Sequence, residues 1–307
     1  MRIAVLGVGG VGGYFGGRLA AAGNDVYFIA RGAHLQAIRA HGLRIESING
    51  DATIQPAQAS DNPAAIGPVD LVLLGVKSWQ VAQAAESARS LLGPQTAVLP
   101  LLNGVEAALI LSDVLGPQHT LGGLCKIIAY IAAPGLIRHT GIAPSVTFGE
   151  LDNTRSARVE AILAAFTQAG VGAEIAPDIQ RAIWEKFLLI VTWSGIGAIT
   201  RAPIGVWRSL PGTRAMAEQS MREALAVAHA HGVNLPDSAV EATLKFIDGV
   251  QAGGTASMQR DIMEGRPSEL EAQNGALVRL GAGAGVDTPL HRFIYNSLLP
   301  QEQAARS

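Results

Sequence analysis

The sequence predicts an α/β domain with a doubly wound, mainly parallel sheet, followed by an all-α domain. Strand-like apolar runs alternate with helical segments through the first half of the chain, whereas strand signals nearly vanish after Pro177. A glycine-rich turn also follows the first apolar run directly. We therefore expect one domain over residues 1–176 and a second over residues 177–307.

The N-terminal residues predict a strand, a glycine turn and a helix. Ile3–Leu6 is a short apolar run that a parallel sheet can bury on both faces. Gly7 allows a tight turn, Gly9 lets a pyrophosphate approach the backbone, and Gly12 lets the helix pack closely on the sheet. An ordinary tight turn is the alternative, but the position between strand and helix favours a Rossmann domain. Its dinucleotide loop would comprise Gly7, Val8, Gly9, Gly10, Val11 and Gly12.

The residue after the second predicted strand, Val26-Tyr-Phe-Ile-Ala30, indicates which dinucleotide binds. Enzymes that prefer NAD usually carry an acidic residue there, which binds the ribose 2′-hydroxyl. This chain has Arg31 instead, and a guanidinium suits a 2′-phosphate. We therefore expect NADPH as the cofactor, with a solvated surface arginine as the alternative interpretation.

The composition indicates a compact globular protein, with 49% hydrophobic and 16% charged residues. This apolar content also allows a homodimer. A net charge of -2 and the absence of a basic run argue against nucleic acid or an acidic membrane as a partner. The apolar segment 187–200 is shorter than the roughly 20 residues that span a bilayer.

Cysteine and histidine usage predicts the compartment and the metal content. The single cysteine, Cys125, cannot form an intrachain disulfide, and buried packing is its expected role. The seven histidines form no metal-binding pattern. We expect a cytoplasmic protein without a metal.

Later segments continue the alternation and then become helical. The expected strands are bounded by turn residues and lie at 70–76, 96–102, 135–139 and 145–149. The last two are expected to run antiparallel at the sheet edge. The expected helices lie at 79–91, 178–200, 213–231, 236–249 and 269–284.

Two polar residues follow predicted strands, Lys77 after 70–76 and Asn103 at the end of 96–102. Ligands of open α/β sheets bind at the carboxyl ends of the strands. A lysine there can hydrogen-bond ribose or phosphate oxygens, and an asparagine amide can bond nicotinamide or substrate. Loop residues with structural hydrogen bonds are the alternative.

The helix predicted at 178–200 is apolar almost all round after Lys186, as a buried helix is. At helical spacing, Lys186, Ile190, Ser194 and Gly197 share one face. From these residues alone, Lys186 either extends to solvent along its aliphatic stem or places a cation in a site.

The chain resembles the ketopantoate reductase family over nearly its whole length. The resemblance rests on Gly7-Val-Gly-Gly-Val-Gly12, Val76-Lys-Ser-Trp-Gln80, Leu102-Asn-Gly104, Trp184-Glu-Lys186, and Ser257-Met-Gln-Arg-Asp261 leading to Glu269. It implies a Rossmann domain, a helical domain similar to that of 6-phosphogluconate dehydrogenase, and NADPH in the cleft between them.

The resemblance also implies residue roles. Lys186 is the general acid, and Glu269 is the acid beside it and the cofactor ribose, so both are expected to be catalytic. Other positions match groups near the ligands: Lys77 and Asn103 at the nicotinamide and substrate, Ala129 at the cofactor, and Ser257 at the substrate carboxylate. Without the resemblance, Ser257 would be interpreted as a surface hydroxyl.

The chain departs from the family's pocket at several asparagine positions. Ile190 and Ser194 stand one and two helical turns after the lysine, and Ile204 and Gly254 stand at two further asparagine positions. We expect Ile190 and Ser194 to line the substrate pocket. A polar group buried without a partner costs roughly 1–3 kcal/mol, so this pocket disfavours a hydroxylated substrate unless waters replace the missing amides.

The expected activity is NADPH-dependent reduction of a 2-oxo acid to a 2-hydroxy acid, by default ketopantoate to pantoate, as in pantothenate biosynthesis. Three alternatives stay open: a more apolar 2-oxo acid or ketone, an opine-dehydrogenase-like reductive condensation with an amine, and a non-catalytic NADP(H)-binding sensor. Opine dehydrogenases generally use a histidine as the acid, whereas this helix offers Lys186. Retention of Lys186, Ser257 and Glu269 together argues against a sensor.

Overall fold

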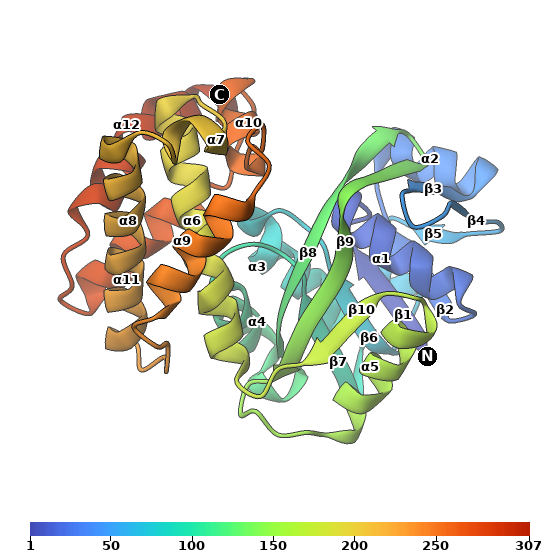
Figure 1. Cartoon of the computed structure of the whole chain (residues 1–307). Helices are drawn as coiled ribbons and strands as arrows, with labels where there is room; N and C mark the ends of the chain where they lie inside the picture. The colour runs from blue at the N-terminus through green and yellow to red at the C-terminus, as the bar shows by residue number, and fades with distance from the viewer. The chain divides into compact units, whose positions relative to one another are not determined.

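The computed structural model describes all 307 residues as two compact units (Figure 1). The first unit contains Met1–Leu102 and Ala107–Ile179, and the second contains Asn103–Glu106 and Gln180–Ser307. These units differ from the expected domains at residues 177–179 and at the short segment from Asn103 to Glu106. That segment belongs to the helical unit although it lies within the sequence of the first.

The first unit contains a parallel sheet in the order β5-β2-β1-β6-β7. Ile3 and Val5 of the central strand face one apolar core, and Ala4 and Leu6 face another, so the sheet is buried on both faces. Its strands are β1 (Arg2–Leu6), β2 (Asp25–Ile29), β5 (Gln58–Ser60), β6 (Val69–Leu74) and β7 (Leu92–Pro100). The helices of this unit are α1 (Gly10–Ala21), α2 (Gly32–His41), α3 (Val81–Ala88), α4 (Ala107–Leu115) and α5 (Ala157–Gln168).

A second five-stranded sheet was not anticipated from the sequence. It consists of β3 (Leu43–Ser47), β4 (Ala52–Ile54), β8 (Leu121–Ala133), β9 (Leu136–Glu150) and β10 (Gly172–Ile175). The short strands expected at 135–139 and 145–149 are both parts of β9, so their expected position at the edge of the first sheet was wrong. The pairing of β9 with β8 skips residues 141–144, where Gly141 has φ +81°, and the pairing continues on either side of them (Figure 1).

Helix α1 packs against both sheets through glycine. A Cβ on Gly16 would lie 2.6 Å from Val5 of the first sheet, and one on Gly13 would lie 2.7 Å from Ile137 of the second. Real Cβ atoms do not approach this closely. The glycines after the dinucleotide motif therefore allow the helix to sit between two sheets rather than against one.

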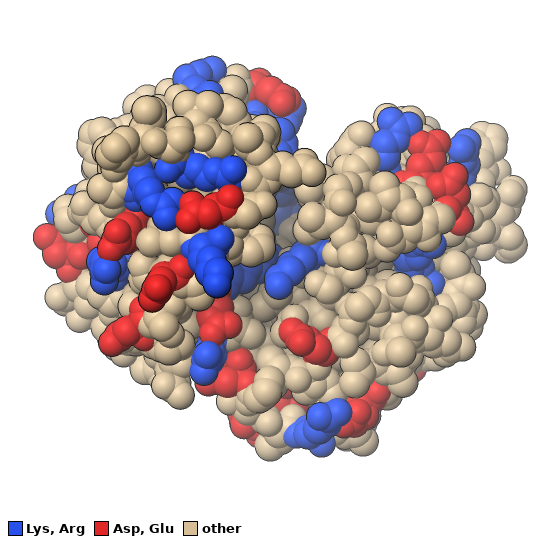
Figure 2. Space-filling view, viewed as in Figure 1, with Lys and Arg blue, Asp and Glu red and all other residues tan.

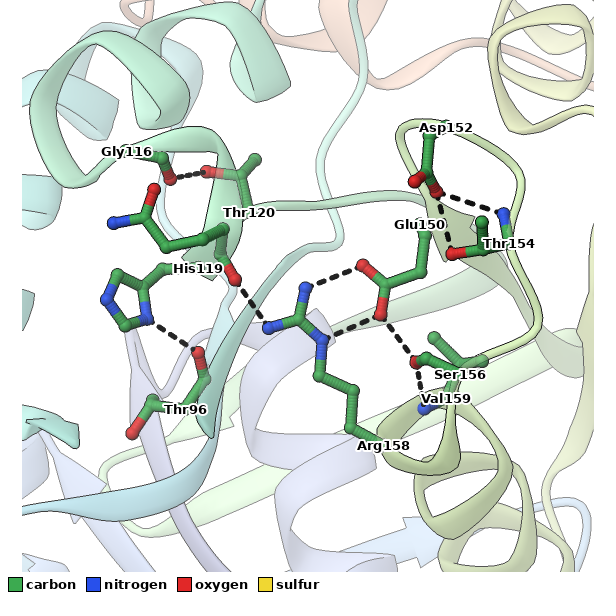
Figure 3. A network of polar contacts seen from close by, with 11 residues as sticks. Thr96, Gly116, His119, Thr120, Glu150, Asp152, Thr154, Ser156, Arg158 and Val159 are labelled. Carbon is green, nitrogen blue, oxygen red and sulfur yellow. Dashed lines mark hydrogen bonds and ion pairs between the residues drawn. The ribbon is translucent and has the colours of Figure 1, made fainter. Parts of the chain in front are cut away.

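A partly buried ion pair joins the end of β9 to α5 (Figure 3). Arg158 donates to Glu150 at 2.6 and 2.7 Å and to the Gln118 carbonyl at 2.6 Å. Ser156, the N-cap of α5, donates to Glu150 at 2.6 Å. Burial acts to raise the pKa of Glu150, but the hydrogen bonds from Arg158 and Ser156 outweigh it and hold the pKa below its usual value.

The second unit is helical around α6 (Ile179–Thr200), as expected. Helix α6 is long and apolar enough to cross a membrane, but 61% of its most apolar window is buried, which is typical of a core helix. The other elements are α7 (Ile204–Trp207), α8 (Pro211–Ala230), α9 (Ala239–Gly249), α10 (Ser257–Met263), the π-helix η5 (Glu271–Gly275), α11 (Ala276–Gly283) and α12 (Pro289–Arg306).

Helix α12 was missed in the sequence, although it carries a helical signal. Leu290, Ile294 and Leu298 recur at intervals of four residues, and all three are buried in the core of the helical unit. Pro300 within the helix and the polar residues around it obscured the pattern.

The face of the helical unit that Figure 2 shows carries basic and acidic side chains next to each other. Arg222 pairs with Glu218 one turn away on α8, and Arg214 pairs with Asp248 on α9, each at 2.6 Å. Because these charges are paired with opposite ones, this face carries no large patch of positive or negative charge.

Candidate functional site

Three neighbouring parallel strands end together at one edge of the first sheet. Leu6 pairs with Ile29 of β2 and with Leu74 of β6 in register. The residues that follow these strands include Gly7, Arg31 and Lys77, so three of the expected dinucleotide positions lie at the same sheet edge.

The glycines of this turn have distinct physical roles. Gly7 has φ +91°, and a Cβ there would lie 2.8 Å from the backbone of Gly75. A Cβ on Gly12 would lie 2.2 Å from the Gly7 carbonyl oxygen. A Cβ on Gly9, by contrast, would meet only the Gly75 oxygen, at 4.0 Å. Gly7 and Gly12 are needed for the turn itself, whereas Gly9 leaves open space that a pyrophosphate can enter.

The N-terminus of α1 suits an anion. Gly9 is the N-cap, and the first hydrogen bond of the helix runs from the Gly13 N–H to the Gly9 carbonyl at 2.8 Å. The N–H groups of Gly10, Val11 and Gly12 precede that bond and have no acceptor within the helix. No acidic residue lies in the first turn. This cradle fits the diphosphate of a dinucleotide.

Ala129 lies against this loop from the second sheet. A Cβ on Gly10 would lie 2.1 Å from the Ala129 carbonyl oxygen, so β8 packs directly on the start of α1. The expected cofactor position Ala129 therefore borders the glycine loop through its backbone. Val8, another residue of the loop, is buried at 4% exposure.

Arg31 is the N-cap residue of α2, and its exposed side chain forms no hydrogen bond or ion pair within the protein. One turn later, the Nδ1 atom of His34 accepts a hydrogen bond from the Gly135 N–H at 3.0 Å. Burial lowers the pKa of His34, so that imidazole is neutral at pH 7. Arg31 is consequently the cation that this turn offers to a ligand.

Lys77 is exposed and begins the short 3-10 helix η2 (Ser78–Gln80). Its Nζ lies 5.8 Å from the centre of the Trp79 ring, within the range of a cation–π contact. The backbone N–H of Lys77 donates to the Gln80 side chain at 3.2 Å. These contacts position the lysine at the carboxyl end of β6.

The second group of expected residues lies within the helical unit, on α6. Lys186 and Ile190 are half-buried, and Ser194 is 1% exposed with its hydroxyl unpaired. Trp184 and Phe187 on the same helix are buried, with ring centres 5.5 Å apart. Their burial fixes the rotation of α6 about its axis, and helical spacing places Lys186, Ile190 and Ser194 on one face.

Asn103 is held beside the π-helix η5. A Cβ on the following Gly104 would lie 3.1 Å from the Ala272 carbonyl oxygen. Glu106 forms an ion pair with Arg279 at 3.0 Å. These contacts explain why the segment after β7 belongs to the helical unit, and they place Asn103 near the stretch that begins with Glu269.

Glu269 is 7% exposed and follows a firmly anchored serine. The Ser268 N–H and hydroxyl both donate to the Glu302 carboxylate, at 3.0 and 2.5 Å. Arg306 pairs with Glu302 at 2.6 Å and donates to the Ser268 carbonyl at 2.9 Å. Helix α12 therefore fixes the backbone from which Glu269 extends, a role that sequence patterns did not indicate.

Three further positions named in the sequence analysis lie elsewhere in the helical unit. Ser257 is exposed in the first turn of α10. Ile204 is fully buried in the core of the helical unit, where it packs rather than lines an open surface. A Cβ on Gly254 would lie 3.1 Å from the Trp193 ring, which occupies the space a side chain there would need.

One polar residue of this region was missed. Gln273 is fully buried, and neither its amide nitrogen nor its amide oxygen has a hydrogen-bond partner. Leaving such a group unpaired costs roughly 1–3 kcal/mol per atom. Its spacing of four residues from Glu269 was the available sequence signal. No group of three or more His, Cys, Asp or Glu side chains could hold a metal ion.

Comparison with known proteins identifies the family. The family model described as ketopantoate reductase PanE/ApbA matches residues 3–153, and the model of its C-terminal domain matches residues 178–302. The chain belongs to the ketopantoate reductase family. It is accordingly an oxidoreductase acting on CH–OH groups, with the expected Rossmann domain and helical C-terminal domain.

Individual relatives match over nearly the full length. The 2-dehydropantoate 2-reductase of Mesorhizobium japonicum is 32% identical, covering 94% of each chain. The crystal structure of a PanE/ApbA family ketopantoate reductase from Ralstonia eutropha is 33% identical, with a TM-score of 0.91 and complete coverage of both chains. A D-mandelate dehydrogenase solved with NADH and anilino(oxo)acetate has a TM-score of 0.90 at 24% identity, which shows a shared fold.

Proposed function

We propose that the protein reduces a 2-oxo acid to a 2-hydroxy acid with NADPH, and that ketopantoate is its default substrate. The observation that carries the proposal is Lys186, a half-buried cation at the head of an apolar face of α6. The similarity to 2-dehydropantoate 2-reductases supports the reaction type. Because this reaction draws on a cellular NADPH pool and the one cysteine is buried and forms no disulfide, we propose the cytoplasm as its compartment.

The first unit would hold the cofactor. The N–H groups at the start of α1 would bind the diphosphate, Gly9 would allow its approach, and Arg31 would pair with the 2′-phosphate. Lys77 would bond ribose or phosphate oxygens, and Ala129 would border the cofactor. When bound, NADPH supplies a hydride to the carbonyl carbon of the substrate.

The helical unit would bind the substrate and supply the proton. As the carbonyl carbon is reduced, its oxygen gains negative charge, which the Lys186 ammonium stabilises and then protonates. Glu269 would hold the ammonium in place and contact the ribose, while Asn103 and Ser257 would donate hydrogen bonds to the substrate. The products are a 2-hydroxy acid and the oxidised cofactor.

A panel assay tests this proposal. NADPH oxidation is followed with ketopantoate, with larger apolar 2-oxo acids, and with a 2-oxo acid plus an amine. We expect turnover without the amine. A strict amine requirement would indicate reductive condensation, and NADPH binding without turnover of any compound would indicate a sensor.

Ile190 favours a second candidate substrate, a 2-oxo acid with a larger apolar side chain. The side chain of Ile190 is half-buried one turn after Lys186, so it would present hydrocarbon where the substrate binds. A methylene in an apolar pocket contributes about 1–3 kcal/mol to discrimination between substrates.

Replacing Ile190 and Ser194 together by asparagine should raise kcat/KM for ketopantoate relative to the apolar 2-oxo acid. Every 1.4 kcal/mol that a new hydrogen bond contributes in the transition state should raise the ratio of the two kcat/KM values about tenfold. The ratio is measured for both proteins under identical conditions, with thermal melting to confirm folding. An unchanged ratio would place these two side chains outside the substrate pocket.

A further inference from the structure

Two fully buried glutamines in the helical unit differ in their hydrogen bonding. Gln259 uses both ends of its amide: its Oε1 accepts from the Ala256 N–H at 3.3 Å, and its Nε2 donates to the Ala202 carbonyl at 3.0 Å. Gln273 is buried to the same extent, yet neither its Nε2 nor its Oε1 has a partner. Buried polar groups in proteins are rarely left unpaired, so the amide of Gln273 requires a hydrogen-bond partner from outside the chain.

The backbone places Gln273 on the same side as Glu269. The Gln273 N–H bonds the Glu269 carbonyl at 3.0 Å, and the Gly275 N–H bonds the Leu270 carbonyl at 3.0 Å, which forms the π-turn. Residues four apart share a face in either helix type. Single π-turns of this kind occur frequently at functional sites.

The neighbours of this π-turn are other residues of the proposed substrate site. A Cβ on Gly195, which follows Ser194 on α6, would lie 2.9 Å from the Asn274 amide nitrogen. Asn103 precedes Gly104, which abuts the Ala272 carbonyl. The stretch containing Gln273 is therefore bordered by α6 on one side and by the Asn103 segment on another.

The neighbouring amide of Asn274 is paired at its nitrogen and unpaired at its Oδ1, so Gln273 is the amide of this turn with both ends unpaired. The Asn274 Nδ2 pairs with the Nδ1 of His291 at 3.0 Å, and His291 in turn bonds Ser220. The Ser194 hydroxyl and the Asn274 Oδ1 are also unpaired, but each offers a ligand a single atom, whereas Gln273 offers a donor and an acceptor.

We propose that Gln273 binds a hydroxyl on the substrate's side chain and so selects hydroxylated 2-oxo acids. A hydroxyl both donates and accepts, and it can satisfy either end of the amide. A carboxylate only accepts, and it would set negative charge beside the amide oxygen. This inference rests on the proposed 2-oxo acid reduction. It supplies from η5 the amide that α6 lacks at Ile190 and Ser194.

The test compares two substrates that differ only in the hydroxyl, ketopantoate and its deoxy analogue. In Gln273→Leu, kcat/KM for ketopantoate should fall about 10- to 100-fold, while that for the deoxy analogue should change less than about threefold. Leucine is similar in size and removes an amide that has no protein partner, so the melting temperature should not fall. Gln259→Leu, the matched variant, should lower the melting temperature without changing the ratio of the two substrates.

Equal losses on both substrates in Gln273→Leu, or an unchanged preference for ketopantoate, would overturn the inference. If the unmodified protein reduces neither compound with NADPH, the proposed function fails separately. Calorimetric titration with ketopantoate then decides about Gln273, because equal affinity of the unmodified protein and Gln273→Leu would refute its binding role.

Discussion

Replacing Lys186 by alanine should lower turnover by at least about 100-fold while leaving NADPH affinity nearly unchanged. General acids contribute about 10²- to 10⁴-fold to rate, and here the ammonium also stabilises the charge that develops on the carbonyl oxygen. The lysine lies on α6 in the helical unit, whereas the glycine loop and Arg31 lie in the first unit. Lys186→Ala should therefore lose turnover and keep its affinity for the dinucleotide.

Turnover is measured with saturating NADPH and 2-oxo acid, and NADPH affinity by fluorescence titration. Lys245→Ala is the control, because Lys245 is an exposed lysine on α9 without an ion pair. Turnover of Lys186→Ala close to that of the control would remove Lys186 from the mechanism. A parallel loss of NADPH affinity would instead indicate that Lys186 acts in binding.

Replacing Arg31 by aspartate should weaken NADPH binding about 10- to 100-fold and affect NADH binding much less. A hydrogen bond to a charged group contributes about 1.5–3 kcal/mol, and the introduced carboxylate repels the 2′-phosphate while suiting a free 2′-hydroxyl. The exposed Arg31 side chain has no partner within the protein, so its loss removes no structural contact.

Dissociation constants for both dinucleotides are measured by fluorescence titration. Lys245→Asp changes the net charge by the same amount at an exposed position of the helical unit and serves as the control for the change in net charge. Equal weakening of NADPH and NADH in Arg31→Asp would contradict the assignment of Arg31 to the 2′-phosphate.

The features predictable from sequence were local. The glycine loop depends on residues 7–12 alone, and α6 depends on an apolar pattern within one segment. The second sheet was not predictable, because it pairs β3 with β9, which lies about a hundred residues further along the chain and shows no local signal of its partner. The assignment of Asn103 to the helical unit depends likewise on Glu106 pairing with the distant Arg279.

The candidate site shows the same division. Lys186, Ile190 and Ser194 share a face because helical spacing is regular, and a sequence reveals that spacing. The sequence does not reveal that Glu302 anchors Ser268, or that the amide of Gln273 is buried without a partner. Burial and pairing depend on the whole fold, so the spacing of Gln273 from Glu269 indicates only that the two residues can share a face.

The most direct test of the proposed reaction follows the hydride. Ketopantoate is reduced with NADPH that carries deuterium at the transferable position of nicotinamide C4, and the product is examined by mass spectrometry and NMR. We expect deuterium on C2 of pantoate in proportion to the NADPH oxidised. NADPH oxidation without label at C2, or no turnover of any 2-oxo acid, would contradict it.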